Sequence, residues 1–394
     1  MTTRVLYSTA LAVVALSIPR PAFAQRSVTD ILSFLLTNRS IITGDAALDD
    51  AAAAATRDTM SRFLLVELTT VPTVSSSTGF VYRMDRNLGG VVVRSSDSFG
   101  PVFVERSLTS GNLWPSFGVA YQETRFSQVD GRPLRDGTLV ATAARLTGQP
   151  QPYDVETVAI RLRTRTLTLS TNIGVTDRVD VSALLPLISL SLSGERTDTL
   201  RGVSVLQATA RVDASGVGDL VVRAKYNAIG RGATGMAIGL ETRLPTGAEE
   251  NLLGAGEVSL QPRLIGSLER GRVSVHGDVG YAFGGLSREL DYAGAVSVIG
   301  NSQITLVGEI LGRRLESGGR IVDTVAPHPT LGGVETIRLS GVPEATYRAL
   351  AVGSVKWNVA QTWLLSASVL RSLTSTGLTA KIIPSLVVEY SFGR

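Results

Sequence analysis

Hydrophobic and polar residues alternate along most of the chain from Thr78 onward, which is typical of β-strands that face different surroundings on their two sides. We predict strands at 117–126, 156–173, 178–190, 218–228, 234–244, 257–268, 272–283, 302–314, 319–326, 345–357, 363–371 and 379–392, with shorter candidates at 80–84, 91–94 and 102–106. Most reach the roughly 9 to 11 residues of a tilted membrane strand. The pattern favours an antiparallel barrel over a soluble all-β protein.

The connectors between these segments differ in length, and the two kinds alternate. Short connectors are 174–177, 230–233, 270–271, 317–318 and 358–362, and longer ones are 191–217, 245–256, 284–301 and 327–344. Short periplasmic turns and long outer loops are typical of bacterial outer-membrane barrels, which have an even number of strands. We therefore predict an all-β fold: a transmembrane antiparallel β-barrel of about 12 to 14 strands with a short helical N-terminal segment.

The alternation also assigns the two faces of each strand. In 272–283, Val273 and Val275 share one face, and Ser274 and His276 share the other. Because an Arg or Lys at mid-bilayer costs about 2 to 4 kcal/mol, the charged faces should point into the lumen. The predicted lumen-lining or substrate-binding residues are Arg161, Arg163, Arg165, Arg223, Lys225, Glu241, Arg243, Arg263, His276, Asp278 and Glu309.

Aromatic residues and the last strand fit the same picture. Tyr226, Tyr281, Phe283, Trp357, Trp363 and Tyr390 fall near strand ends, where barrels carry aromatic girdles. In the final strand Leu386, Val388, Tyr390 and Phe392 share the outward face. Such a strand resembles the carboxy-terminal signal read by the barrel-assembly machinery, although Gly393 and Arg394 follow the last aromatic residue.

The first 75 residues lack the two-residue period. Residues 1–24 have the basic, apolar and Ala22-Phe23-Ala24 regions of a Sec signal peptide. Residues 25–75 are predicted as two helices, at 28–36 and 45–68, which form either a plug or periplasmic lid or a helix packed on the barrel rim. Residues 76–394 are the predicted barrel.

Composition narrows the classes of function. Arg4 and Arg20 are the charged residues of the signal segment, so the net charge of +4 falls to +2 without it, and we expect no nucleic-acid partner. The chain has no cysteine, which excludes disulfides and a lipid-anchored N-terminus. Apolar residues make up 44%, yet no later stretch is long enough for a membrane-spanning helix.

Several motifs resemble an outer-membrane transporter family named for the meta-cleavage pathway of phenol degradation. They are 98–106 (SFGPVFVER), 174–181 (GVTDRVDV) with Leu185-Pro186, 216–220 (GVGDL), 223–226 (RAKY) and 243–247 (RLPTG) with 249–254 (EENLLG). The resemblance covers roughly residues 90 to 310 and the final strand. It implies a barrel that transports solutes, but no motif specifies the solute.

The arginines at 161, 163 and 165 are the sharpest electrostatic feature. They could attract anionic solutes in the lumen, pair with Glu241, Glu257 or Glu309, or bind lipopolysaccharide phosphate. Aspartates 177 and 219 are interpreted as turn residues.

Enzyme chemistry has little support. Ser274 and His276 lie two apart on one strand face, as an outer-membrane acyl hydrolase could use them, but no orienting group or oxyanion site is marked. Only two histidines exist, which excludes a histidine-rich metal site, and we expect no cofactor.

Three functions remain open. The first is passive passage of small, hydrophobic or aromatic compounds through the outer membrane. The second is a structural or adhesive barrel without flux, and the third is the acyl hydrolase. The expected partners are outer-membrane lipid and lipopolysaccharide, the barrel-assembly machinery and a small-molecule solute.

Overall fold

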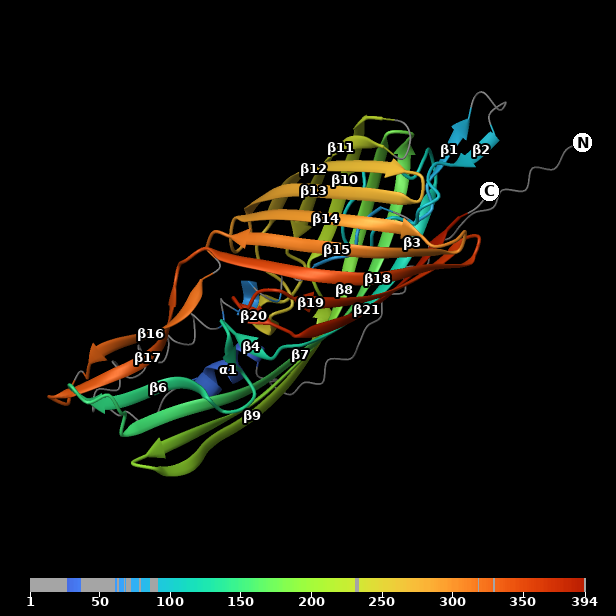
Figure 1. Ribbon diagram of the computed structural model, residues 1–394. Coiled ribbons are helices and arrows are strands. Elements are labelled where there is room, and N and C mark those ends of the chain that lie inside the picture. Colours follow the sequence, from blue (N-terminus) through green and yellow to red (C-terminus); the bar gives the residue numbers. More distant parts are fainter. Residues whose placement is uncertain are drawn as a thin grey trace, which may run out of the picture.

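The chain folds as a closed antiparallel barrel (Figure 1). The computed structural model describes residues 27–36, 61, 64–66, 68, 72–77, 79–85, 91–230, 234–317, 319–328 and 330–392. Within them, twelve strands form the ring, which confirms the predicted range: β3 (Pro115–Arg125), β7 (Asp154–Thr176), β8 (Val179–Leu200), β10 (Leu220–Ile229), β11 (Gly235–Leu244), β12 (Ser259–Arg270), β13 (Val273–Gly284), β14 (Glu289–Ile299), β15 (Ile304–Leu315), β18 (Thr346–Ala360), β19 (Trp363–Ser372) and β21 (Ile382–Ser391).

The ring closes through β7, which pairs with β3 on one side and with β8 on the other. Closure leaves no open ring edge in lipid, where each unpaired backbone group would cost several kcal/mol. The outer face is apolar, as the alternation predicts. Its exposed side chains include Phe117, Leu169, Ile238, Leu264, Val275, Val296, Ile310, Val355, Val369 and Leu386. We call this surface the apolar belt.

Aromatic rings cluster on the belt near the strand ends, as predicted. Trp363 and Tyr390, on neighbouring strands, have ring centroids 4.8 Å apart, and Phe392 lies 4.8 Å beyond Tyr390. Tyr281 and Phe283 form a second pair at the opposite strand ends, also at 4.8 Å. Amphipathic rings of this kind sit at the level of lipid head groups. The two groups therefore bracket the part of the barrel that lies in hydrocarbon.

The two ends of the barrel differ. At one end the connections are short, at 177–178, 230–234, 271–272, 300–303 and 361–362, and β3 begins and β21 ends there. We call this the short-turn end. The other end carries the longer connections at 126–153, 201–219, 245–258, 316–345 and 373–381. One expected loop, 284–301, instead contains ring strand β14, so its two turns lie at opposite ends.

A sheet extends beyond the ring at the long-connection end (Figure 1). Strands β7 and β8, with 23 and 22 residues, outrun their ring neighbours. Additional strands pair along them: β6 (Leu139–Leu146), β17 (Val334–Val342) and β16 (Arg320–Pro327) on one side and β9 (Val203–Val217) on the other. The predictions of loops at 191–217 and 327–344 are therefore wrong, and the strand predicted at 319–326 is real but lies outside the ring.

The helix α1 (Val28–Leu36) confirms the first predicted helix. It packs on β8 and β9 and on the short helix η2 (Glu249–Asn251), through buried Val28, Leu32 and Leu35. This is the long-connection end, whereas a periplasmic lid would lie at the short-turn end. The signal segment 1–24 and most of the helix predicted at 45–68 fall outside the described residues. In the part of the chain that is described, no helix is long and apolar enough to cross a membrane.

The residues before β3 do not extend the ring. Strands β1 (Tyr82–Asp85) and β2 (Val91–Arg94) pair only with each other, and a small separate sheet joins β20 (Leu378–Thr379), β4 (Gln128–Val129) and β5 (Arg132–Pro133). The strand predicted at 102–106 is wrong. Its residues are buried without strand structure, because their backbone hydrogen bonds go to side chains on the barrel wall.

Candidate functional site

A segment of irregular chain, 95–113, lies inside the barrel and is held by inward-facing side chains of the wall. The strongest anchor is Glu309 on β15. Its carboxylate accepts hydrogen bonds from the backbone N–H groups of Val102, Phe103 and Val104 at 2.9, 2.8 and 2.9 Å. Hydrogen bonds to an ionised acceptor are about twice as strong as neutral ones. We call residues 95–113 the plug segment.

Further wall residues hold the plug segment along its whole length. Acceptors on the wall are Asp278 for the N–H of Glu105, Ser267 for Ser107 and Asp180 for Ser110, at 2.9 to 3.1 Å. The wall also supplies donors to backbone carbonyls of the plug segment. Lys356 donates to the carbonyl of Pro101, Lys225 to that of Arg106 and Asn227 to that of Ser107, at 2.8 to 3.2 Å. Nearly all of these wall residues belong to the short-turn half of the ring, so that half of the lumen is filled.

Glu105 links the plug segment to the residues that precede it. Its carboxylate accepts a hydrogen bond from the N–H of Ser76 at 2.7 Å and lies 3.3 Å from Arg223 and 3.9 Å from Lys225. Burial alone would raise the pKa of Glu105, but the charges of Lys225 and Arg223 and the hydrogen bonds from Ser76 and Ser77 outweigh it and hold the pKa at about 2. The group is therefore ionised at any physiological pH.

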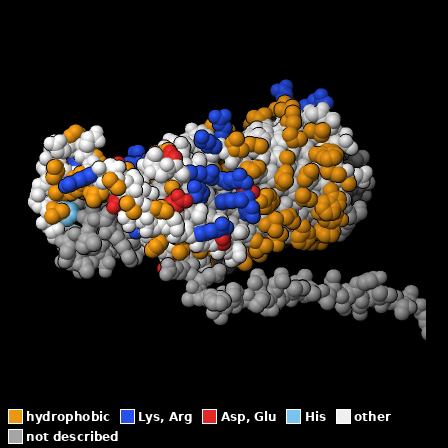
Figure 2. Space-filling model, turned by 90° about the horizontal axis from the view of Figure 1, so that it is seen from below, with side chains coloured by type: hydrophobic (Ala, Val, Ile, Leu, Met, Phe, Trp, Pro, Cys, Tyr) orange, Lys and Arg blue, Asp and Glu red, His pale blue; other side chains and the backbone are white. Residues whose placement is uncertain are grey.

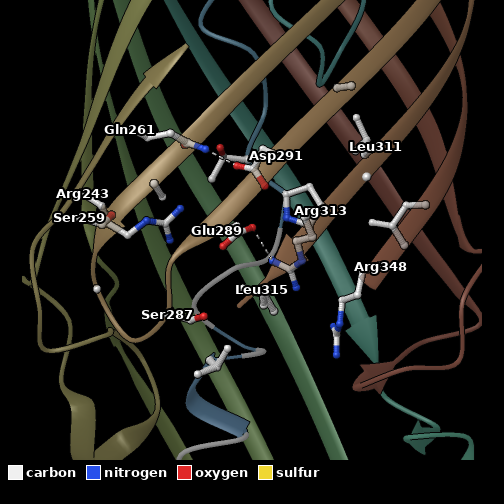
Figure 3. Close-up of a pocket in the computed structure, with 18 of the residues that line it drawn as sticks. Arg243, Ser259, Gln261, Ser287, Glu289, Asp291, Leu311, Arg313, Leu315 and Arg348 are labelled. Atoms are coloured by element: carbon white, nitrogen blue, oxygen red, sulfur yellow. Dashed lines mark hydrogen bonds and ion pairs between the residues drawn. The ribbon is translucent and has the colours of Figure 1, made fainter. Parts of the chain in front are cut away.

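Arginines and carboxylates alternate across neighbouring wall strands on the long-connection side of the plug segment. Arg223 on β10 pairs with Glu241 on β11 at 2.7 Å. Arg263 on β12 pairs with Asp278 on β13, and it lies 3.2 Å from Asp291 on β14. The ladder continues with Arg313 on β15, which lies 3.7 Å from Glu289 on β14. In Figure 3, Glu289 and Arg313 point toward each other along this wall.

This ladder forms one wall of a chamber of about 200 Å³ inside the barrel. Phe103 and Glu105 of the plug segment contribute to its lining, as do Val66 and Pro72 from the residues that precede the ring. Apolar residues supply much of the remaining lining, and Arg348 of β18 lies among them. These apolar residues are Phe126, Leu311, Leu350, Leu378, Ala380 and Ile383. The chamber is thus amphipathic, with charged groups and aliphatic and aromatic groups together in its lining.

Eight of the predicted lumen residues do face inward. Arg223, Glu241, Arg243, Arg263 and Asp278 line the chamber. Lys225, His276 and Glu309 lie deeper, at the level of the plug segment, where each is at most 4% exposed. Asp278 belongs to both levels, since it also accepts a hydrogen bond from the N–H of Glu105, and His276 contacts Ser267, which accepts from the N–H of Ser107. The role of these eight residues toward a solute stays a prediction.

Arg161, Arg163 and Arg165 do not line the lumen. They share the outward face of β7 with Leu167 and Leu169, while Ile160, Leu162 and Thr164 point inward and are buried. Their carboxylate partners are Glu123 and Glu195, none of those expected from the sequence. The prediction failed because β7 continues past the apolar belt, where an outward charge meets water and costs little.

Several chamber residues were not predicted from the sequence. Glu289 and Asp291 lie on β14, which was taken for a loop, and Arg313 lies at the end of β15. The alternation of Leu290, Tyr292, Val296 and Val298 on the other face of β14 is the signal that could have found them. Glu105 had no such signal, since it belongs to no strand.

The expected serine–histidine pair is not joined by a hydrogen bond. Nδ1 of His276 lies 2.9 Å from the hydroxyl of Ser267, and the hydroxyl of Ser274 donates to Ser98 of the plug segment at 3.2 Å. Both side chains are at most 3% exposed. Ser274 thus contacts the plug segment directly, whereas His276 contacts Ser267 of the wall, which in turn accepts from the N–H of Ser107.

The solved structures to which the chain is similar are barrels at low identity. The COG4313 outer membrane channel from Pseudomonas putida F1 matches with 13% identity and a TM-score of 0.48, over 73% of this chain and 98% of that one. The translocator domain of autotransporter NalP from Neisseria meningitidis matches with 12% identity and a TM-score of 0.37, over 72% and 89%. The Ralstonia pickettii toluene transporter TbuX matches with 11% identity and a TM-score of 0.28, over 72% of this chain and 90% of that one.

Among curated proteins, no sequence matches the chain. A family profile does match, over residues 137–299, and its description is "Putative MetA-pathway of phenol degradation". These residues include the motifs from 174 to 254 on which the resemblance rests. The family resemblance inferred from the sequence is therefore confirmed, over residues 137–299.

Proposed function

We propose that the protein is an outer-membrane channel for the passive passage of small hydrophobic or aromatic compounds. Closed antiparallel barrels with an apolar belt, short turns at one end and long connections at the other are the spanning structures of bacterial outer membranes. In that arrangement the short-turn end faces the periplasm. The chamber opens toward the long connections, and the plug segment separates it from the periplasmic end.

The observation that carries the proposal is the amphipathic chamber. An apolar cavity of about 150 Å³ is enough to hold benzene, so a chamber of about 200 Å³ has room for one monoaromatic molecule. Its apolar side chains would contact the ring, and the arginine ladder would bind a hydroxyl or acidic substituent. The description of the matched family, which names phenol degradation, agrees with such a solute.

A chamber-filling variant tests this directly. Ala293 of β14 lines the chamber, so Ala293→Trp should occupy it, whereas Ala367→Trp on β19 places the same ring on the exposed belt. In liposomes we expect entry of benzenesulfonate to fall at least tenfold with Ala293→Trp and to be unchanged with Ala367→Trp. Equal entry through both variants, or no entry through the unchanged protein, would refute the proposal.

A second candidate is a structural or adhesive barrel without flux. The filled short-turn half of the lumen favours it, as does the sheet of β6, β9, β16 and β17 that projects beyond the ring. The two candidates differ in one readout. A barrel without flux gives no solute entry under any condition in which it stays folded, and loss of the projecting sheet then affects attachment alone.

Two further assignments complete the proposal. The last ring strand, β21, carries Leu386, Val388 and Tyr390 outward and Ser385 and Ser391 inward, and we assign it as the signal for the barrel-assembly machinery. Residues 1–24 are assigned as a Sec signal peptide. Export followed by assembly into the outer membrane accounts for both.

A further inference from the structure

A group of arginines borders the apolar belt on one side of the barrel. Figure 2 shows Lys and Arg side chains gathered at the edge of a hydrophobic surface. The residues come from neighbouring strands: Arg125 of β3 and Arg161, Arg163 and Arg165 of β7. We call these four residues the basic patch. They lie on the half of the barrel that carries the long connections.

The strand register places the edge of the belt between two successive rows of outward residues. In one row Tyr121 of β3 is opposite Leu167 of β7, which is opposite Leu187 of β8. In the next outward row Glu123 is opposite Arg165, which is opposite Ser189. Successive outward residues on a strand are about 7 Å apart. The surface therefore changes from apolar to basic within one step along the strand.

The basic patch keeps a positive charge despite its acidic neighbours. Glu123 lies 2.7 Å from Arg125, 2.8 Å from Arg163 and 3.9 Å from Arg165, so three guanidinium groups share one carboxylate. Arg161 pairs with Glu195 at 3.2 Å, and both are exposed. Four arginines and two carboxylates leave a net charge of +2. Each guanidinium also has five N–H donors, more than these contacts use.

Hydroxyl groups flank the arginines on the next strand. In the register of β7 and β8, Arg161 is opposite Ser193, Arg163 is opposite Ser191 and Arg165 is opposite Ser189. Residues that pair directly in an antiparallel sheet point to the same face. The arginines and serines thus form one outward surface in which cationic and neutral donors are neighbours, a composition suited to phosphate oxygens. On the far side of the serines, Ser191 is hydrogen-bonded to Asp213 of β9, which pairs with Arg211.

We propose that the basic patch binds the phosphate groups of phosphorylated glycolipids in the outer leaflet, the lipopolysaccharide class. The acyl chains of such a lipid would contact the belt at Tyr121, Leu167 and Leu187, and its phosphates would then lie at the level of the arginines. Arginine suits this contact because its planar group binds a phosphate through two parallel hydrogen bonds. The inference rests on the outer-membrane location and needs no flux through the barrel.

The basic patch gathers four arginines from two neighbouring strands on one side of the ring, whereas β15 at the same end presents Arg314 over the ring of Tyr347. At the same end, Val258 just before β12, Leu260 of β12 and Phe283 of β13 are exposed. There an apolar surface continues to the strand end. A single lipid bound beside β3, β7 and β8 fits the cluster of four arginines.

Purified protein in nanodiscs tests the site, with bisphosphorylated and dephosphorylated lipid A as the two probes. The variant is Arg163→Ser/Arg165→Ser/Glu123→Gln, which removes the arginines without leaving their carboxylate unpaired. The matched control is Arg320→Ser, since Arg320 is an exposed, paired arginine on β16, away from the belt. We expect the unchanged protein to bind the bisphosphorylated lipid at least tenfold more tightly than the dephosphorylated one, and the triple variant to lose this preference.

Further readouts keep the outcome interpretable. The gel shift between heated and unheated samples reports the folded barrel, and Arg163→Lys/Arg165→Lys, which keeps the charge, should retain part of the preference. Inorganic phosphate at millimolar concentration should not compete. Equal binding of both lipids by the unchanged protein, a preference kept by the triple variant, or competition by free phosphate would each overturn the lipid site. Failure of solute entry would refute the channel and leave this site untouched.

Discussion

Leu35 of α1 rests on Gly194 of β8, at a position where no larger residue would fit. A Cβ atom on Gly194 would lie 2.6 Å from Cδ1 of Leu35 and 3.0 Å from the carbonyl oxygen of Ala159. Arg196, two residues further along β8, donates to the carbonyl of Phe34 at 3.2 Å. These contacts fix the helix on the inner face of the projecting sheet.

The variant Gly194→Leu should therefore displace α1. The steric conflict involves packed side chains and backbone, and overpacking costs about 1 to 3 kcal/mol, which is enough to undock a nine-residue helix while the ring stays intact. Cleavage within α1 by a protease should become faster, with unchanged heat modifiability of the barrel. The control is Gly266→Ala on β12, because a Cβ atom at Gly266 would have no atom within 4 Å. Equal cleavage of both variants would contradict the docking of α1.

Stability of the projecting sheet should depend on pH. Glu156 lies beyond the apolar belt, 3.0 Å from Arg196, and both side chains are at most 5% exposed. Burial raises the pKa of Glu156 to about 7 despite the charge of Arg196, and burial with nearby Asp198 raises the pKa of Asp154 to about 7. The folded sheet therefore binds protons more tightly than the unfolded chain does.

The sign of the effect follows from the raised pKa. The stabilising contribution is complete below about pH 4.5 and is lost as the pH rises through 7, by on the order of 3 kcal/mol for the Glu156 shift. Hydrogen exchange at the amides of β6 and of the outer half of β8 should accelerate from pH 5 to pH 8 beyond the intrinsic rate. In Glu156→Gln the acceleration beyond the intrinsic exchange rate should be smaller. Amide protection that stays constant or rises from pH 5 to pH 8 would show that the carboxyl of Glu156 is ionised in the folded sheet.

Periodicity predicted the ring well because lipid imposes a strict rule on every ring strand. Strand β14 was not predicted because the side chains in its middle, Ala293 to Ala295, are small and give little hydrophobic signal. Among the projecting strands, β16 was predicted. Strands β9 and β17 were missed because they lie outside lipid, where polar residues such as Arg211 and Glu335 are tolerated on exposed faces.

The site was harder to predict than the ring. Segment 102–106 has the composition of a strand, but its backbone partners lie on Glu309 and Asp278, more than 170 residues away. No local pattern encodes such a contact. For Arg161, Arg163 and Arg165 the alternation was read correctly, and only the depth of the residues in the membrane was missing. That depth depends on where the apolar belt ends along β7, between Leu167 and Arg165.

The plug segment is the central feature of this account, and Glu309 is the residue that tests it. Replacing its carboxylate in Glu309→Gln weakens three backbone hydrogen bonds, each worth about 1.5 to 3 kcal/mol with a charged acceptor. The side chain keeps its shape, so the ring should remain folded. Glu250→Gln, an exposed residue of η2, is the control.

Single-channel conductance in planar bilayers is the most direct measurement. We expect small or rare conductance from the unchanged protein and from Glu250→Gln, because the plug segment fills the short-turn half of the lumen. Glu309→Gln should open at least tenfold more often. A large, steady conductance of the unchanged protein, or identical records for Glu309→Gln and Glu250→Gln, would contradict a plug held by Glu309.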